Sequence, residues 1–82
     1  MVKLTFEPIF RETINKLNDS SIKEKIKKQI QKIADNPEIG KPMRHNRKGT
    51  REVYVKPYRL SYSYSQEQDE IIFLEFYHKD KQ

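Results

Sequence analysis

The chain has 82 residues, no cysteine and a formal net charge of +5, with 17 lysine and arginine residues against 12 acidic ones. This length suits one domain with a single small core, so we expect one domain over residues 1–82. A chain without cysteine excludes disulfides and thiolate metal sites and suits a reducing compartment. Because the longest apolar run, Ile71–Leu74, is too short to span a bilayer, we expect a cytoplasmic protein with no membrane partner. The basic balance favours an anionic partner.

The first half of the chain predicts one strand and two helices. Residues 2–6 alternate between apolar and polar side chains, as a strand with one buried face does. Pro8 suits the first turn of a helix, and Ser21 with Glu24 matches a capping box, so a second helix is expected to begin near Ile22. Asn36–Pro37 should end it. The apolar stripes are Phe10, Ile14 and Leu17 in the first helix and Ile22, Ile26, Ile30 and Ile33 in the second.

The second half predicts three strands, at residues 52–56, 58–65 and 71–77. Pro57 marks a tight connection, and the polar residues 66–70 mark a hairpin turn. The apolar face is expected to carry Tyr58, Leu60, Tyr62 and Tyr64, completed by Ile72, Leu74 and Phe76. We therefore predict an α+β fold: an N-terminal strand, a two-helix hairpin and a three-stranded antiparallel meander, with the helices packed on one face of the sheet.

A basic run precedes these strands. Between residues 41 and 51 there is no acidic residue, and such a run is typical of a loop that faces phosphates. The alternative, a lysine-rich surface that is merely solvated, is the interpretation we adopt for the outer face of the second helix. The candidate nucleic-acid-binding residues are Lys41, Arg44, His45, Arg47, Lys48 and Arg51, together with Lys56 in the next strand.

The sheet face opposite the apolar one should gather phosphate binders and proton carriers. Its expected members are Glu52, Tyr54, Lys56, Arg59, Glu75 and Tyr77, with His78 and Lys79 at the end of the last strand. An arginine there can hold a phosphate, and a histidine, tyrosine or glutamate can move the proton of a ribose 2′-hydroxyl. A cross-strand ion pair of Arg59 with a glutamate is the structural alternative. The two histidines, His45 and His78, have no cluster of carboxylates beside them, so we expect neither a metal site nor a cofactor.

Three segments, residues 36–42, 49–62 and 76–81, resemble the RelE/ParE superfamily of toxin–antitoxin modules. The most specific part is Tyr58-Arg-Leu followed by Tyr62, then a strand that ends in His78 and basic residues. The resemblance implies a RelE-like microbial ribonuclease fold and a prokaryotic toxin that a cognate antitoxin neutralises. No pattern indicates the oligomeric state.

Within that superfamily, the RelE-like branch cleaves messenger RNA on the ribosome by metal-independent 2′-hydroxyl attack, and the ParE-like branch inhibits DNA gyrase. The resemblance gives Arg59 the role of contacting the scissile phosphate, His78 that of a proton carrier, and Lys79 that of assisting the leaving group. Glu52 is a candidate general base, or Tyr54 and Lys56 share that role. We expect a ribosome-dependent endoribonuclease; the alternatives are a gyrase inhibitor and an inactive binding relative.

Overall fold

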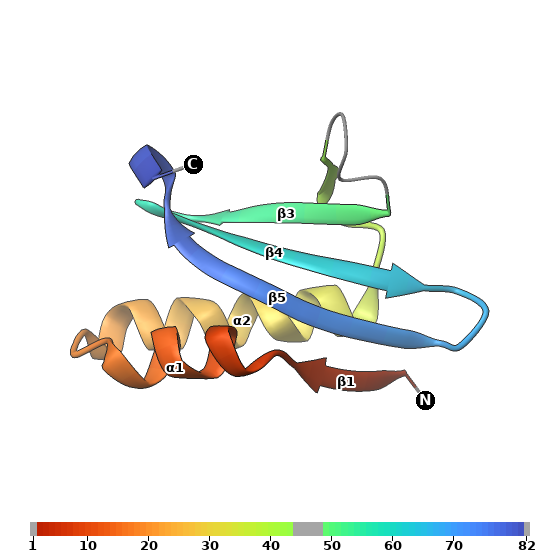
Figure 1. Cartoon of the computed structure of the whole chain (residues 1–82), viewed down its shortest axis with the longest axis horizontal. Helices are drawn as coiled ribbons and strands as arrows, with labels where there is room; N and C mark the ends of the chain where they lie inside the picture. Colours follow the sequence, from red (N-terminus) through yellow and green to blue (C-terminus); the bar gives the residue numbers. More distant parts are fainter. Residues whose placement is uncertain (1, 44–48, 82) are drawn as a thin grey trace.

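The computed structural model describes residues 2–43 and 49–81. A five-stranded sheet with the order β1-β5-β4-β3-β2 carries both helices on one face (Figure 1). The elements are β1 (Lys3–Phe6), α1 (Pro8–Lys16), α2 (Ser20–Asp35), β2 (Lys41–Pro42), β3 (Thr50–Val55), β4 (Tyr58–Ser65), β5 (Glu70–His78) and a short 3₁₀ turn (Lys79–Lys81). This arrangement confirms the predicted α+β fold and adds the short strand β2, which the sequence analysis missed.

The helix ends follow local chemistry. Asp19, and not Ser21, caps α2, because its carboxylate accepts hydrogen bonds from the backbone nitrogens of Ser21 (2.9 Å) and Ile22 (3.2 Å). The predicted capping box is therefore wrong. The hydrogen bond from the Ser21 hydroxyl is the main reason that the pKa of Asp19 lies below its usual value. At the other end, α2 stops at its C-cap Asn36, as predicted.

The strands pair as a meander with one irregularity. Strands β3, β4 and β5 are antiparallel neighbours, and β1 joins the outer side of β5 in parallel. Between β4 and β5 the register shifts: Ser61 lies opposite Glu75, but Tyr62 lies opposite Phe73. Leu74 is thus the extra residue of a β-bulge, and the alternation of β5 changes phase there.

The core lies between the sheet and the helices. Its buried apolar residues are Phe10, Ile26, Ile33, Val55, Leu60, Tyr62, Ile71, Phe73 and Phe76. The helical stripes are confirmed, since their remaining members pack against this cluster. The prediction that Ile72 and Leu74 belong to the buried face is wrong, because the bulge turns Ile71 and Phe73 toward the helices instead.

A buried tyrosine holds the segment that joins α2 to β2. The Tyr62 hydroxyl donates to the carbonyl of Pro37 (2.7 Å) and accepts from the backbone nitrogen of Gly40 (2.9 Å), and burial raises the pKa of Tyr62. A Cβ atom at Gly40 would lie 2.7 Å from this hydroxyl oxygen, so the close approach requires glycine. The Arg51 guanidinium donates to the carbonyls of Glu38 (3.0 Å) and Gly40 (2.8 Å).

Candidate functional site

Arg59 lies on the open face of the sheet, on the side away from the helices. Its cross-strand neighbours are Tyr54 on β3 and Tyr77 on β5. Its Nη1 lies 3.5 Å from Oε1 of Glu52, with both side chains largely buried at 23% and 16% exposure. Its guanidinium carbon also sits 5.0 Å from the centroid of the Tyr54 ring. The predicted cross-strand ion pair is therefore present, and it holds the guanidinium in place on the open face.

Glu52, on β3, contacts side chains of both β4 and β5. Its Oε1 faces Arg59, and its Oε2 accepts a hydrogen bond from the Tyr77 hydroxyl at 3.2 Å. Within residues 2–43 and 49–81, the Nε of Arg59 is the one buried side-chain polar atom without a hydrogen-bond partner. This nitrogen is a donor that the described protein groups leave without an acceptor.

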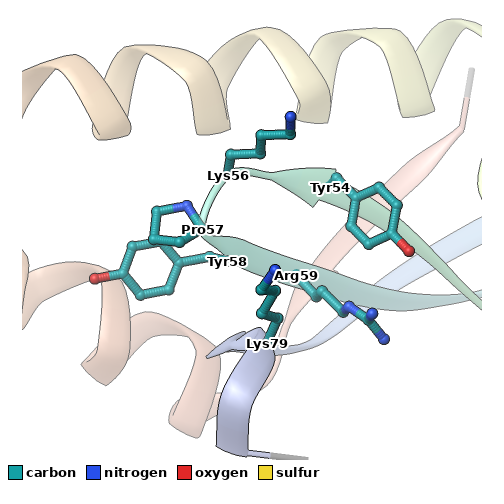
Figure 2. Close-up of a pocket in the computed structure, with 6 residues that line it drawn as sticks. All are labelled: Tyr54, Lys56, Pro57, Tyr58, Arg59 and Lys79. Atoms are coloured by element: carbon teal, nitrogen blue, oxygen red, sulfur yellow. The ribbon is translucent and has the colours of Figure 1, made fainter.

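A cavity of about 390 Å³ opens beside Arg59. It is lined by Tyr54, Lys56, Pro57, Tyr58, Arg59 and Lys79 (Figure 2). Figure 2 shows Tyr54 and Arg59 extending in the same direction from adjacent strands, whereas the Tyr58 ring points the opposite way. The backbone nitrogen of Lys79 donates to the carbonyl of Pro57 (3.2 Å), which fixes the end of β5 against the β3–β4 turn. The cavity thus collects three cationic side chains next to a carboxylate, which suits an anionic ligand.

His78 lies on the other face of the sheet. It pairs with Tyr58, and their rings meet edge to face at 5.6 Å. Its Nδ1 lies 3.6 Å from Oδ2 of Asp80. Lys79, but not His78, therefore lines the cavity beside Arg59, and we expect Lys79 and not His78 to carry the proton.

The predicted nucleic-acid-binding residues have separate fates. Lys56 lines the cavity beside Arg59, and Lys41 is exposed on β2. Arg51 instead faces the core side, opposite Tyr62, where it binds the two loop carbonyls. The remaining members, Arg44, His45, Arg47 and Lys48, lie outside the described residues. The sequence analysis placed Tyr77 on this face but gave it no role, although its alternation with Glu75 already marked it as a neighbour of Arg59.

Residues 2–43 and 49–81 contain no group of three or more histidine and acidic residues placed to hold a metal ion. In the same residues, no helix is long and apolar enough to cross a membrane.

Comparison with known proteins identifies the family. A model of the ParE toxin of the type II toxin–antitoxin system, parDE, matches residues 4–82. The chain belongs to this toxin family. The match confirms the resemblance to the RelE/ParE superfamily drawn from residues 36–42, 49–62 and 76–81. Curated protein sequences give no significant match to this family member.

Solved structures of toxins share its fold. A chain of the RelBE2 toxin–antitoxin complex of Mycobacterium tuberculosis is 23% identical, with a TM-score of 0.80 and coverage of 95% of this chain and 98% of that one. A chain of the intact Escherichia coli RelBE complex is 19% identical, with a TM-score of 0.82 and coverage of 95% and 96%. The YoeB/ParE toxin of Agrobacterium tumefaciens is 17% identical, with a TM-score of 0.84 and coverage of 94% and 98%. These similarities establish the fold of this ParE-family chain.

Proposed function

We propose that this ParE-family toxin is an endoribonuclease that cleaves messenger RNA on the ribosome, by attack of a ribose 2′-hydroxyl on the adjacent phosphate. The observation that carries the proposal is the cavity beside Arg59. Lys56, Arg59 and Lys79 line this cavity, and Oε1 of Glu52 lies 3.5 Å from Nη1 of Arg59, which supports binding of a phosphate there. A phosphate binder with a neighbouring base is what this reaction needs, since it requires charge stabilisation and proton transfer.

Each group has a step to perform. Glu52 accepts the 2′-hydroxyl proton, the 2′-oxygen forms a bond to phosphorus, and the bond from phosphorus to the 5′-oxygen breaks. The products are a 2′,3′-cyclic phosphate and a free 5′-hydroxyl. Arg59 stabilises the charge that grows on the non-bridging oxygens, and Lys79 supplies the proton to the leaving 5′-oxygen. Tyr54 with Lys56 is the second choice for the base.

The ion pair of Arg59 with Glu52 fits this sequence of events. In the free protein the guanidinium and the carboxylate neutralise each other across 3.5 Å. A phosphate that binds Arg59 competes with Oε1 for the same donor, and the freed carboxylate then faces the incoming ribose. Tyr77 keeps Oε2 in position through its hydroxyl. The pair therefore stores the base beside the phosphate binder until substrate arrives.

We also infer a cognate antitoxin in the same cytoplasmic compartment. Structural neighbours of this chain are the toxin–antitoxin complexes RelBE2 and RelBE. An open groove of about 470 Å³ between α1 and α2 offers a place for it. The groove is lined by Phe6, Phe10, Ile14, Ile26 and Ile30, with Arg11, Lys23 and Lys27 at its edges.

Inhibition of DNA gyrase is the second candidate function. The family description favours it, because the matched model is that of the ParE toxin. In that case the cations beside Arg59 contact a protein or DNA surface and no RNA is cut.

One experiment in cells separates the two functions. The toxin is induced, new 5′ ends of messenger RNA are mapped, and the supercoiling of a plasmid is followed in the same culture. We expect breaks within translated codons, and these should disappear in an Arg59→Ala variant. Altered plasmid topology without RNA breaks would assign the gyrase function instead.

A further inference from the structure

A second cavity adjoins the one beside Arg59, on the other side of Tyr54. It has a volume of about 290 Å³ and lies where β3 meets β2 and α2. Lys32, Ile39 and Lys41 line it together with Tyr54, which also lines the cavity beside Arg59. Tyr54 therefore borders both cavities.

The walls of the second cavity combine exposed apolar surface with positive charge. Tyr54 is 53% exposed and Ile39 is 47% exposed, and both border this one cavity. Lys32 and Lys41 are both exposed to solvent. Glu52 also lines this cavity, but its two oxygens are directed to Arg59 and Tyr77.

We propose that this cavity is a second nucleotide subsite for single-stranded RNA, with Lys32 and Lys41 holding a phosphate next to the scissile one and Tyr54 with Ile39 packing against a base. The inference rests on the proposed ribonuclease function, because Arg59 then holds the scissile phosphate. Proteins that bind single-stranded nucleic acid combine a cationic groove with aromatic side chains on which bases stack. The second cavity supplies both components at one edge of the sheet.

A structural role alone explains only part of this arrangement. Lys32 lies in the last turn of α2, where a cation also suits the helix dipole. That role accounts neither for Lys41, which comes from a different element, nor for the exposure of Ile39. The lysines of α2 border two different cavities: Lys23 and Lys27 border the groove between the helices, and Lys32 borders the second cavity at the sheet edge.

The test compares two lengths of RNA that cannot be cleaved. A 2′-O-methyl dinucleotide and a 2′-O-methyl tetranucleotide are titrated into the isotope-labelled protein and followed by NMR. In the Lys32→Gln/Lys41→Gln variant, we expect roughly tenfold weaker binding of the tetranucleotide, as for two exposed ionic contacts. Dinucleotide binding, which needs only the Arg59 cavity, should stay the same. The slope of log affinity against log salt should fall by about 0.7 for the tetranucleotide, because contacts to one phosphate are lost.

Two further sets of variants accompany the test, a charge control on α2 and a pair of substitutions at Tyr54. The Lys23→Gln/Lys27→Gln variant also removes two positive charges, both from α2 at the groove between the helices, and it should bind both probes as the unaltered protein does. Tyr54→Leu should weaken tetranucleotide binding by at least roughly fivefold, whereas Tyr54→Phe should retain it, because stacking needs the ring and not the hydroxyl.

Several outcomes would overturn the subsite. They are an equal loss in both double variants, an equal loss for both probe lengths, and no loss at all. If the dinucleotide binds in an Arg59-dependent way while the added nucleotides gain nothing from Lys32 and Lys41, only the second subsite fails. If the unaltered protein binds neither probe, the second subsite is refuted, whereas the proposed function is judged separately by the 5′ ends mapped in cells.

Discussion

Replacing Arg59 by alanine is expected to slow single-turnover cleavage of ribosome-bound messenger RNA by about a hundredfold or more, as loss of one preorganised charge-stabilising donor does. The guanidinium acts mainly on charge that develops in the transition state, so association with ribosomes, followed by co-sedimentation, should change much less. Arg59→Lys keeps the charge but loses the planar fork, and a loss of roughly tenfold is expected.

The same change has a predictable effect on stability. Without Arg59, the Glu52 side chain, 16% exposed, loses its cationic partner and keeps the hydrogen bond from the Tyr77 hydroxyl at 3.2 Å. The ion pair is neither fully exposed nor fully buried, so we expect the free energy of unfolding to fall by about 1–3 kcal/mol. Adding Glu52→Gln to the alanine variant removes the uncompensated charge and should restore part of that loss in urea denaturation.

Arg11→Ala is the matched control for the kinetic effect. Arg11 is exposed on α1 and borders the groove between the helices, far from the open sheet face in the layer arrangement. It should cleave at the unaltered rate. If Arg59→Ala is folded by circular dichroism and cleaves as fast as Arg11→Ala, the assignment of Arg59 to the scissile phosphate is refuted.

Three further outcomes follow from the placement of other residues. His78→Ala should fall well short of the roughly hundredfold loss expected for a proton carrier, while Lys79→Ala should reach it in the same single-turnover assay. Gly40→Ala should lower the free energy of unfolding by about 1–3 kcal/mol, since the new Cβ would meet the Tyr62 hydroxyl at 2.7 Å. Tyr62→Phe should cost about 1–3 kcal/mol at neutral pH, because Pro37 and Gly40 lose their shared partner. Because the pKa of Tyr62 is raised, its contribution to the free energy of unfolding is complete below about pH 10 and is lost as pH rises through the folded-state pKa. The stability difference between the unaltered protein and Tyr62→Phe, measured by denaturation from neutral to alkaline pH, should therefore shrink above the folded-state pKa.

The sequence predicted the elements because their apolar periodicity is regular. The helix stripes and the alternation of β3 and β4 follow from packing on one core face, which local patterns record. Strand β2 was missed, since two residues that include a proline give no alternation to detect. The α2 cap was assigned to Ser21 because the motif fits there, but the hydrogen bonds of Asp19 decide where the helix begins.

Arg51 was predicted to bind nucleic acid and His78 to act at the open face of the sheet, but the alternation of side chains along β3 and β5 places both on the core face. Arg51 shares its side of β3 with Val53 and Val55, so it faces the core layer, where its guanidinium serves loop carbonyls. His78 shares its side of β5 with Phe76, although its place at the end of this strand and the family resemblance both favoured it as a neighbour of Arg59. Charge and motif similarity thus favoured both residues, whereas the pleat of the strand decided which face each of them reached.

The bulge at Leu74 is what allows one strand to serve both the core and the site. Tyr62 is paired with Phe73, so an uninterrupted ladder would place Phe76 opposite Arg59 on the open face and Glu75 opposite Leu60 in the core. The extra residue shifts the remainder of β5 by one position, which buries Phe76 and turns Tyr77 toward Arg59 and Glu52. Alternation counted back from Phe76 correctly placed Glu75 and Tyr77 on the open face, and it failed for Ile72 and Leu74 because it crossed this point. A single local irregularity, which no periodic pattern encodes, therefore joins the apolar half of β5 to the half that completes the candidate site.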